Sequence, residues 1–179
     1  MDLSDEQLML AVATGDLAAF DTIVLRHQQA LWSIAYRFLG DPAEAEDVVQ
    51  EAFLRLLALA PRYRPSGGLR AYLRRVVATV CIDATRKKHP VYTDTLPDLP
   101  DSVPGPAKAL RLQELQAQVR QALDALAPQQ RMVLILRHYE ELSYADIAAA
   151  MGTTPKAVEG LLHRARRSLR SSLAKLNRK

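Results

Sequence analysis

A run of prolines near the middle of the chain limits what this sequence can fold into. Five of its ten prolines lie between His89 and Ala107, where they alternate with aspartates and no helical or strand period survives. Because proline lacks a backbone N–H and biases the preceding residue toward extended geometry, residues 90–106 are predicted to form an extended acidic linker. A long loop folded back onto one domain is the alternative. The linker interpretation leaves residues 1–89 and 107–179, each large enough only for a small helical core.

The segments on both sides of the linker carry helix signals. Apolar residues recur at helical spacing, and residues that favour helix N-caps stand before them. The clearest start is Asp41-Pro42 followed by Glu44, which supplies an N-cap, a proline at the first position and a carboxylate in the first turn. We therefore predict an all-α fold of two small helical domains joined by a Pro-rich linker. The expected helices cover residues 4–14, 16–40, 42–57, 69–88, 107–126, 128–140, 143–151 and 155–176.

Composition excludes several classes of protein. Hydrophobic residues make up 49% and charged residues 25%, which excludes a disordered, collagen-like or disulfide-stapled chain. The lone cysteine, Cys81, cannot form an internal disulfide, so we expect a reducing compartment. It lies on an apolar stretch and is interpreted as a core residue, with a redox sensor as the alternative. No apolar run approaches a membrane span and the N-terminus is acidic, so a cytoplasmic protein without membrane insertion is expected.

The helix after Asp41 carries two stripes. One is apolar and is expected to face the core; it comprises Ala45, Val48, Val49, Ala52, Phe53, Leu56 and Leu57. The other is polar with a single leucine, and its members are Asp47, Gln50, Glu51 and Leu54. The second stripe fits either a solvated helix face or a docking face for a basic or polar partner helix.

The helix after Gly68 is basic at both ends. Arginines stand near its start, and Arg86, Lys87 and Lys88 stand at its end. The terminal trio can complement the helix dipole, which is a structural role. The alternative is a phosphate-binding surface, with Tyr63 and Tyr72 available to stack on exposed bases.

The C-terminal segment has the pattern of a helix-turn-helix. Ser143 begins a capping box, Gly152 permits a left-handed turn, and Thr154-Pro155 starts the next helix. From Gly152 onward eight basic residues stand against one acidic residue, a net charge of +7, whereas the whole chain carries +4. A helical hairpin that does not bind DNA could share the turn pattern. The charge favours a recognition helix in the major groove, with phosphate-binding arginines behind it.

Residues 46–55 resemble the core-polymerase-binding segment of bacterial RNA polymerase sigma factors of the extracytoplasmic-function group. The matching motif is Glu-Asp-x-x-Gln-Glu-x-Phe-Leu-Arg. Upstream, residues 15–20 and 35–37 are similar to that group's first conserved stretch. The resemblance implies that residues 44–57 pack on the clamp coiled coil of the polymerase β′ subunit. The implied core-polymerase-binding residues are Asp47, Gln50, Glu51, Leu54 and Arg55.

The basic helix is similar to the segment of this family that melts and reads the −10 promoter element. The matching residues are Tyr72-Leu73, Ile82-Asp83 and the terminal basic run. Tyr72 stands where family members usually have Trp, and Thr79 stands where Asn is common, which leaves the details of base recognition open. The implied DNA-binding residues are Tyr63, Arg70, Tyr72, Arg74, Arg75, Thr79, Arg86, Lys87 and Lys88.

The C-terminal segment closely resembles the −35-reading domain of the group, which also implies contact with the β flap of the polymerase. The similarity includes residues 126–131, 137–140, 157–158 and 163–166. Many members have Ser-Arg where Gly160-Leu161 stands, so the −35 sequence itself stays open. The implied DNA-binding residues are Thr154, Lys156, Glu159, Gly160, His163, Arg164, Arg166 and Arg167.

The resemblance implies a transcription initiation factor that directs core RNA polymerase to promoter DNA. The alternative is a free-standing regulator, with an N-terminal helical sensing or dimerisation domain and a C-terminal helix-turn-helix. The sequence shows no phosphate-binding glycine loop, no His-Glu-x-x-His motif and no clustered Cys/His ligands, so no enzyme, cofactor, catalytic residue or metal is expected. An anti-sigma partner is compatible with the family, and the regulon and inducing signal stay open.

Overall fold

The computed structural model describes residues 3–64, 68–87, 115 and 117–176, and every regular element within them is a helix. The predicted all-α fold is therefore confirmed. None of the described helices has an apolar stretch long enough to cross a bilayer. The elements are α1 (Asp5–Ala13), α2 (Leu17–Leu39), α3 (Pro42–Leu59), the short 3-10 helix η1 (Ala60–Arg62), α4 (Leu69–Lys87), α6 (Pro128–His138), α7 (Tyr144–Met151) and α8 (Pro155–Leu176).

The helices begin after the N-cap residues that the sequence predicts. The backbone N–H of Glu44 donates to Asp41 Oδ1 at 2.9 Å, and this bond starts α3. Ser4 and Gln7 form the predicted capping box of α1. Between α2 and α3, Gly40 adopts a φ of 78°, a left-handed conformation that a side chain would disfavour. Because Gly40 and Asp41 are adjacent, one helix ends and the next begins without an intervening loop.

The predicted capping box at the start of α7 is only half formed. The backbone N–H of Asp146 donates to Ser143 Oγ at 3.1 Å, as expected of an N-cap. The Asp146 carboxylate, however, accepts from the same Ser143 hydroxyl at 2.6 Å. The prediction of a helix start at Ser143 is confirmed. The Asp146 carboxylate binds the Ser143 hydroxyl, so only the Ser143 half of the capping box is present.

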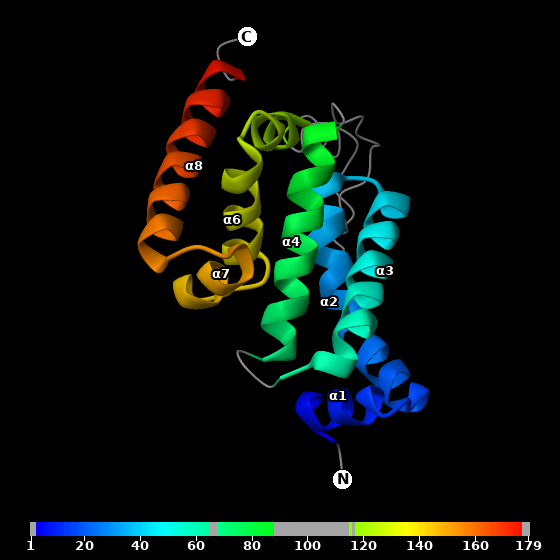
Figure 1. Cartoon of the computed structure of the whole chain (residues 1–179). Coiled ribbons are helices and arrows are strands. Elements are labelled where there is room, and N and C mark those ends of the chain that lie inside the picture. The colour runs from blue at the N-terminus through cyan, green and yellow to red at the C-terminus, as the bar shows by residue number, and fades with distance from the viewer. Residues whose placement is uncertain (1–2, 65–67, 88–114, 116, 177–179) are drawn as a thin grey trace, which may run out of the picture.

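The N-terminal core forms where α2, α3 and α4 pack together, with α1 and η1 at one end (Figure 1). Phe20 and Phe53 meet edge to face between α2 and α3, with ring centroids 6.3 Å apart. The apolar stripe of α3 faces this core, except that Leu57 is 38% exposed. The expectation that Leu57 is buried is wrong, because the apolar stripe is wider than the face that α2 and α4 cover. The largest fully buried side chains of the three helices are Ile23, Ile34, Phe38, Leu56, Leu69, Leu73 and Val77.

The C-terminal helices α6, α7 and α8 pack on one another and also on the N-terminal helices. Helix α4 lies in the middle of Figure 1, with α2 and α3 on one side and α6 and α7 on the other. The buried apolar residues consequently form one continuous cluster through both halves of the chain. The division into residues 1–89, 90–106 and 107–179 stays a prediction, and the proline-rich segment 90–106 lies outside the described residues.

Two neighbouring leucines of α3 test this packing. Leu56 is fully buried and Leu54 is 63% exposed. We expect Leu56→Ala to lower the free energy of unfolding by about 2–5 kcal/mol, because it removes core contacts and leaves a cavity. Leu54→Ala, the matched control, should change it by less than about 0.5 kcal/mol. Urea unfolding followed by circular dichroism measures both, and equal losses would contradict the orientation of α3.

Candidate functional site

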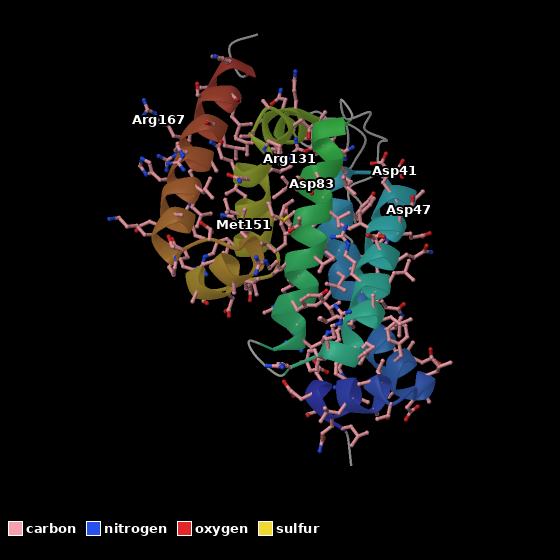
Figure 2. The ribbon with its side chains drawn as sticks, in the orientation of Figure 1. Asp41, Asp47, Asp83, Arg131, Met151 and Arg167 are labelled. Atoms are coloured by element: carbon pink, nitrogen blue, oxygen red, sulfur yellow. The ribbon has the colours of Figure 1, made fainter. Side chains whose placement is uncertain are left out.

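The polar stripe of α3 lies on the outer side of the helix. Asp47, Gln50, Leu54 and Arg55 are exposed, and Glu51 is partly exposed. Figure 2 shows Asp47 pointing away from the rest of the molecule. Arg55 Nε donates to Glu51 Oε1 at 2.7 Å, an exposed pair one helical turn apart that contributes little to stability. The stripe therefore presents charged and polar groups with one exposed leucine on the outer side of α3, and its role as a docking face stays a prediction.

The structure divides the predicted residues around α4 into exposed and covered groups. Arg70, Arg75 and Thr79 are exposed, whereas Tyr72 is partly buried against the core. Thr79 Oγ1 donates to the backbone carbonyl of Arg75 at 2.8 Å. The side chains of Arg86 and Lys87, and the whole of Lys88, lie outside the described residues. The DNA-binding roles assigned to all of these residues stay predictions.

Tyr63 directly follows η1 and is partly buried next to α1. Its ring packs against the core, and its phenolic oxygen is buried with no hydrogen-bond partner in the described part of the chain. Burial raises the pKa of Tyr63, and the negative charges of Glu6 and Asp5 raise it further. This position gives Tyr63 a packing role, and its predicted stacking on bases stays a prediction.

Two arginines of α4 lie beside the C-terminal half, Arg74 partly buried and Arg75 exposed. Arg74 Nη2 lies 3.8 Å from Glu140 Oε2, and both side chains are largely covered. Burial raises the pKa of Glu140, while the nearby Arg74 and Arg37 cations lower it. The Arg75 guanidinium lies against the turn between α7 and α8, where a Cβ added at Gly152 would stand 3.1 Å from its Nη2.

The helix-turn-helix presents its predicted DNA-facing residues to solvent. Gly152 adopts a left-handed φ of 62°, and the backbone N–H of Ala157 donates to Thr154 Oγ1 at 3.2 Å to cap α8. Gly160 is partly buried, and the Arg164 guanidinium lies beside it. Arg167 points outward from α8 in Figure 2, on the side of the molecule opposite Asp47. The exposed members of the predicted set are Thr154, Lys156, Glu159, His163, Arg164, Arg166 and Arg167.

The inner side of the recognition helix packs on the neighbouring helices. Leu162 is 1% exposed and lies in the core, and Leu161 beside it is partly buried against the core. Val158 and Ala165 complete the buried row at helical spacing. This register leaves the basic residues on the outer face.

The residues that join the two halves were not predicted from the sequence. The Arg131 side chain is 4% exposed and donates from Nη1 to the backbone carbonyl of Phe38 at 3.1 Å. The Arg37 guanidinium lies over the Tyr139 ring, 4.0 Å from its centroid. A sequence signal for the first contact exists: Arg131 stands three and four residues before apolar Leu134 and Ile135, on the buried face of its helix. The partners of these arginines carry no local signal.

Metal binding and redox sensing would each depend on particular side chains: a cluster of metal ligands and a reactive thiol. Within the described residues, no cluster of three or more His, Cys, Asp or Glu is placed to hold a metal ion. Cys81 is fully buried, and burial raises the pKa of its thiol far above the usual range. Because the thiolate is the reactive form, this environment favours the core role over the redox-sensor alternative.

Comparisons with known proteins cover nearly the whole chain. The family model for Sigma-70 region 2 matches residues 23–90, and the model for Sigma-70, region 4 matches residues 116–169. An extracytoplasmic-function (ECF) RNA polymerase sigma factor, SigE of Mycolicibacterium smegmatis, is 34% identical over 96% of this chain and 70% of its own length. The RNA polymerase sigma-H factor of Pseudomonas aeruginosa is 31% identical over 97% of this chain and 96% of its own.

Solved structures with a similar fold include two complexes with other proteins. CnrH in complex with the cytosolic domain of CnrY has a TM-score of 0.70 and 29% identity, covering 96% of this chain and 97% of CnrH. The sigma factor RpoE of Bartonella quintana, solved with the anti-sigma factor NepR, has a TM-score of 0.61 and 24% identity, covering 87% and 96%. The second likeness shows the fold alone.

The burial of Cys81 leads to a direct test. We expect iodoacetamide at pH 8 to leave the folded protein unmodified, because the thiol stays protonated and covered, and to alkylate it fully in denaturant. Mass spectrometry measures the extent of alkylation. Rapid modification of the folded protein, with an unchanged circular-dichroism spectrum, would support the redox-sensor alternative.

Proposed function

Because this chain belongs to the extracytoplasmic-function group of RNA polymerase sigma factors, we propose that α3 docks it on core RNA polymerase while α4 and α8 contact the promoter. The chain is a transcription initiation factor, and promoter recognition through the −10 and −35 elements follows from regions 2 and 4. The free-standing regulator is set aside, because both halves of the chain match regions of one sigma family.

The observation that carries the docking proposal is the outer face of α3. Leu54 is 63% exposed and stands among Asp47, Gln50 and Glu51. An exposed apolar side chain with charged and polar neighbours suits an interface with an apolar centre and a polar rim. We assign this face, together with Arg55, to the β′ clamp coiled coil, and the C-terminal half to the β flap.

The promoter-reading proposal rests on the two basic helices. Phosphate contacts position a protein on DNA without reading sequence, whereas groups near the base edges read it. On α8, Glu159 and His163 come from the first turns and are assigned to base edges, while Arg166 and Arg167 follow and are assigned to phosphates. On α4, Arg70, Arg74 and Arg75 are assigned to the −10 region, with Tyr72 as the aromatic group nearest to them in sequence.

The proposed role needs no chemistry from the chain itself. The polymerase performs nucleotide addition, so the factor acts by binding alone and is not an enzyme. We place it in the cytoplasm, where core polymerase works. An anti-sigma partner for this chain stays an expectation, because the likeness to the factor solved with an anti-sigma protein shows the fold alone.

The docking face is tested by reversing one charge. We expect Glu51→Lys to weaken binding to purified core polymerase by about tenfold, equivalent to about 1.4 kcal/mol, because it removes a negative charge from the interface and places a positive one there. The fold should survive, since only the exposed pair with Arg55 is lost. Fluorescence anisotropy with labelled factor measures the affinity.

A control with the same charge change lies outside the docking helix. Asp21 of α2 is also exposed and does not belong to the proposed polymerase-binding segment, so Asp21→Lys reverses a surface charge away from the polar stripe of α3. It should leave core affinity within about twofold of the wild type. Equal losses in both variants would indicate a general charge effect and would count against the assignment of this face to the polymerase.

The recognition helix is tested by separating base contacts from phosphate contacts. Arg167→Ala should weaken all promoters alike and reduce the salt dependence by about one unit of slope. Glu159→Ala should change the preferred −35 base at one position, worth roughly 1–3 kcal/mol, with the salt slope nearly unchanged. A promoter library transcribed with each holoenzyme at two salt concentrations measures both effects. The opposite pattern would show that α8 lies in the groove with another orientation.

A further inference from the structure

The first turn of α1 is fastened to α2 by three polar contacts. Asp5 Oδ1 accepts a hydrogen bond from Arg26 Nη1 at 2.6 Å, and Asp5 Oδ2 lies 2.9 Å from His27 Nε2. Arg26 Nη2 also donates to the backbone carbonyl of Leu3 at 3.1 Å. Two consecutive residues of α2 thus hold both carboxylate oxygens of Asp5, which fixes the place where α1 begins.

The contact between Asp5 and His27 lies largely inside the protein. The side chain of His27 is 5% exposed and that of Asp5 is 18% exposed. Burial lowers the pKa of His27, Asp5 raises it, and the cations Arg70 of α4 and Arg26 lower it. The net direction is downward, so His27 is mostly neutral at pH 7. Because an ionised carboxylate only accepts hydrogen bonds, His27 donates to Asp5 from Nε2.

Apolar packing holds the rest of α1 in the same place. Leu8, Met9 and Val12 are 2%, 0% and 6% exposed and belong to the core cluster. An isolated helix of nine residues is marginal in water, so α1 depends on this burial and on the contacts of Asp5. Helix α1 is therefore a fixed wall of the N-terminal half.

This wall borders the segment that joins the docking helix α3 to the basic helix α4. Helix α1 lies at the lower end of the molecule in Figure 1, against η1, and Tyr63 directly follows η1. The Tyr63 ring packs on the core, and its buried phenolic oxygen lies near enough to the acidic first turn of α1 that Glu6 and Asp5 add to the rise that burial causes in its pKa. The start of α1 thus adjoins an aromatic residue that is predicted to meet promoter DNA.

We propose that Asp5 is a positioning residue for promoter reading: by fastening α1 to α2, it holds Tyr63 and the segment leading into α4 in the geometry that binds the −10 strand. The inference rests on the proposed function, because it assumes that Tyr63 and α4 contact this strand. Asp5 itself does not bind DNA, since its carboxylate is occupied by Arg26 and His27 and would repel phosphates. Its removal should weaken −10 recognition and leave the faces of α3 and α8 intact.

Asp5→Ala in the full chain, assembled with core polymerase, tests this role. The probe is a fluorescent single-stranded oligonucleotide that the wild-type holoenzyme selects from a random library, compared with a scrambled oligonucleotide of the same composition. We expect Asp5→Ala to lower the ratio of the two affinities about fivefold, because the contacts that position Tyr63 are lost. Fluorescence anisotropy measures both affinities.

Glu6→Ala is the matched control. It removes the other carboxylate of the first turn, so both variants lose the same favourable interaction with the helix dipole. Glu6 makes no hydrogen bond or ion pair within the described part of the chain, and its variant should keep the affinity ratio within about twofold of the wild type. An equal fall in both variants would show that the contacts of Asp5 with α2 are not the cause, and would overturn the proposal.

Two further measurements separate positioning from general instability. Val133→Ala in α6 removes buried apolar contacts in the C-terminal half, so it should lower the midpoint of urea unfolding but keep the affinity ratio within about twofold. The affinity of Asp5→Ala for core polymerase should also stay within about twofold of the wild type. An unchanged ratio for Asp5→Ala, an equal fall for Val133→Ala, or a loss of core affinity in place of the ratio would overturn the proposal.

The contact itself is measured by the titration of His27, followed by NMR in the free full-length chain. Because Asp5 raises the pKa of His27 against the effects of burial, Arg26 and Arg70, Asp5→Ala should lower this pKa further, and Glu6→Ala should leave it in place. An unchanged His27 titration in Asp5→Ala would show that the carboxylate is not held there. If the wild-type holoenzyme prefers no sequence over its scrambled form, the proposed role of α4 is wrong, and the role of Asp5 falls with it.

Discussion

The C-terminal end of α2 is the point on which the arrangement of the molecule depends. Gly40 ends α2 in a left-handed conformation, and Asp41 begins α3 at the next residue, so the directions of both helices are fixed within two positions. Arg131 binds the carbonyl of Phe38 in the same turn and brings α6 there. The three helices that meet here position α4 between them, and α4 in turn contacts α7. A change at this turn would therefore move both proposed nucleic-acid surfaces relative to the docking face.

Local features of the fold were predictable because their causes lie within a few residues. Each cap bond joins residues three positions apart, and each apolar stripe repeats within two turns, so the sequence itself contains both partners. The exposure of Glu159 and Arg167 followed from the same periodicity. The error at Leu57 lies at the edge of the apolar stripe, where the width of the covering helices decides burial and periodicity does not.

The packing of the two halves could not be predicted in the same way. Arg131 and Phe38 are 93 positions apart, and the acceptor is a backbone carbonyl that every residue possesses. Arg74 was interpreted as a phosphate-binding group, and its chemistry fits either a phosphate or a carboxylate. Residue type thus indicated that Arg74 binds an anion, while only the tertiary structure showed that Glu140 supplies one within the chain.

The energetics of the contacts between the halves decide whether they can open on binding a partner. Deleting one partner of the Arg131 contact would leave a buried polar group unsatisfied, which is costly. Separation of the halves differs from deletion, because the guanidinium and the Phe38 carbonyl both return to water and recover their hydration. The net contribution of such a charge-assisted bond is then only about 1.5–3 kcal/mol, and the attraction within the largely covered pair at Arg74 is offset by the cost of removing both charges from water. The apolar contacts between the halves add to this, because the buried residues of both halves form one continuous cluster. A partner that separated the halves would therefore have to supply differential binding energy for the apolar as well as the polar contacts.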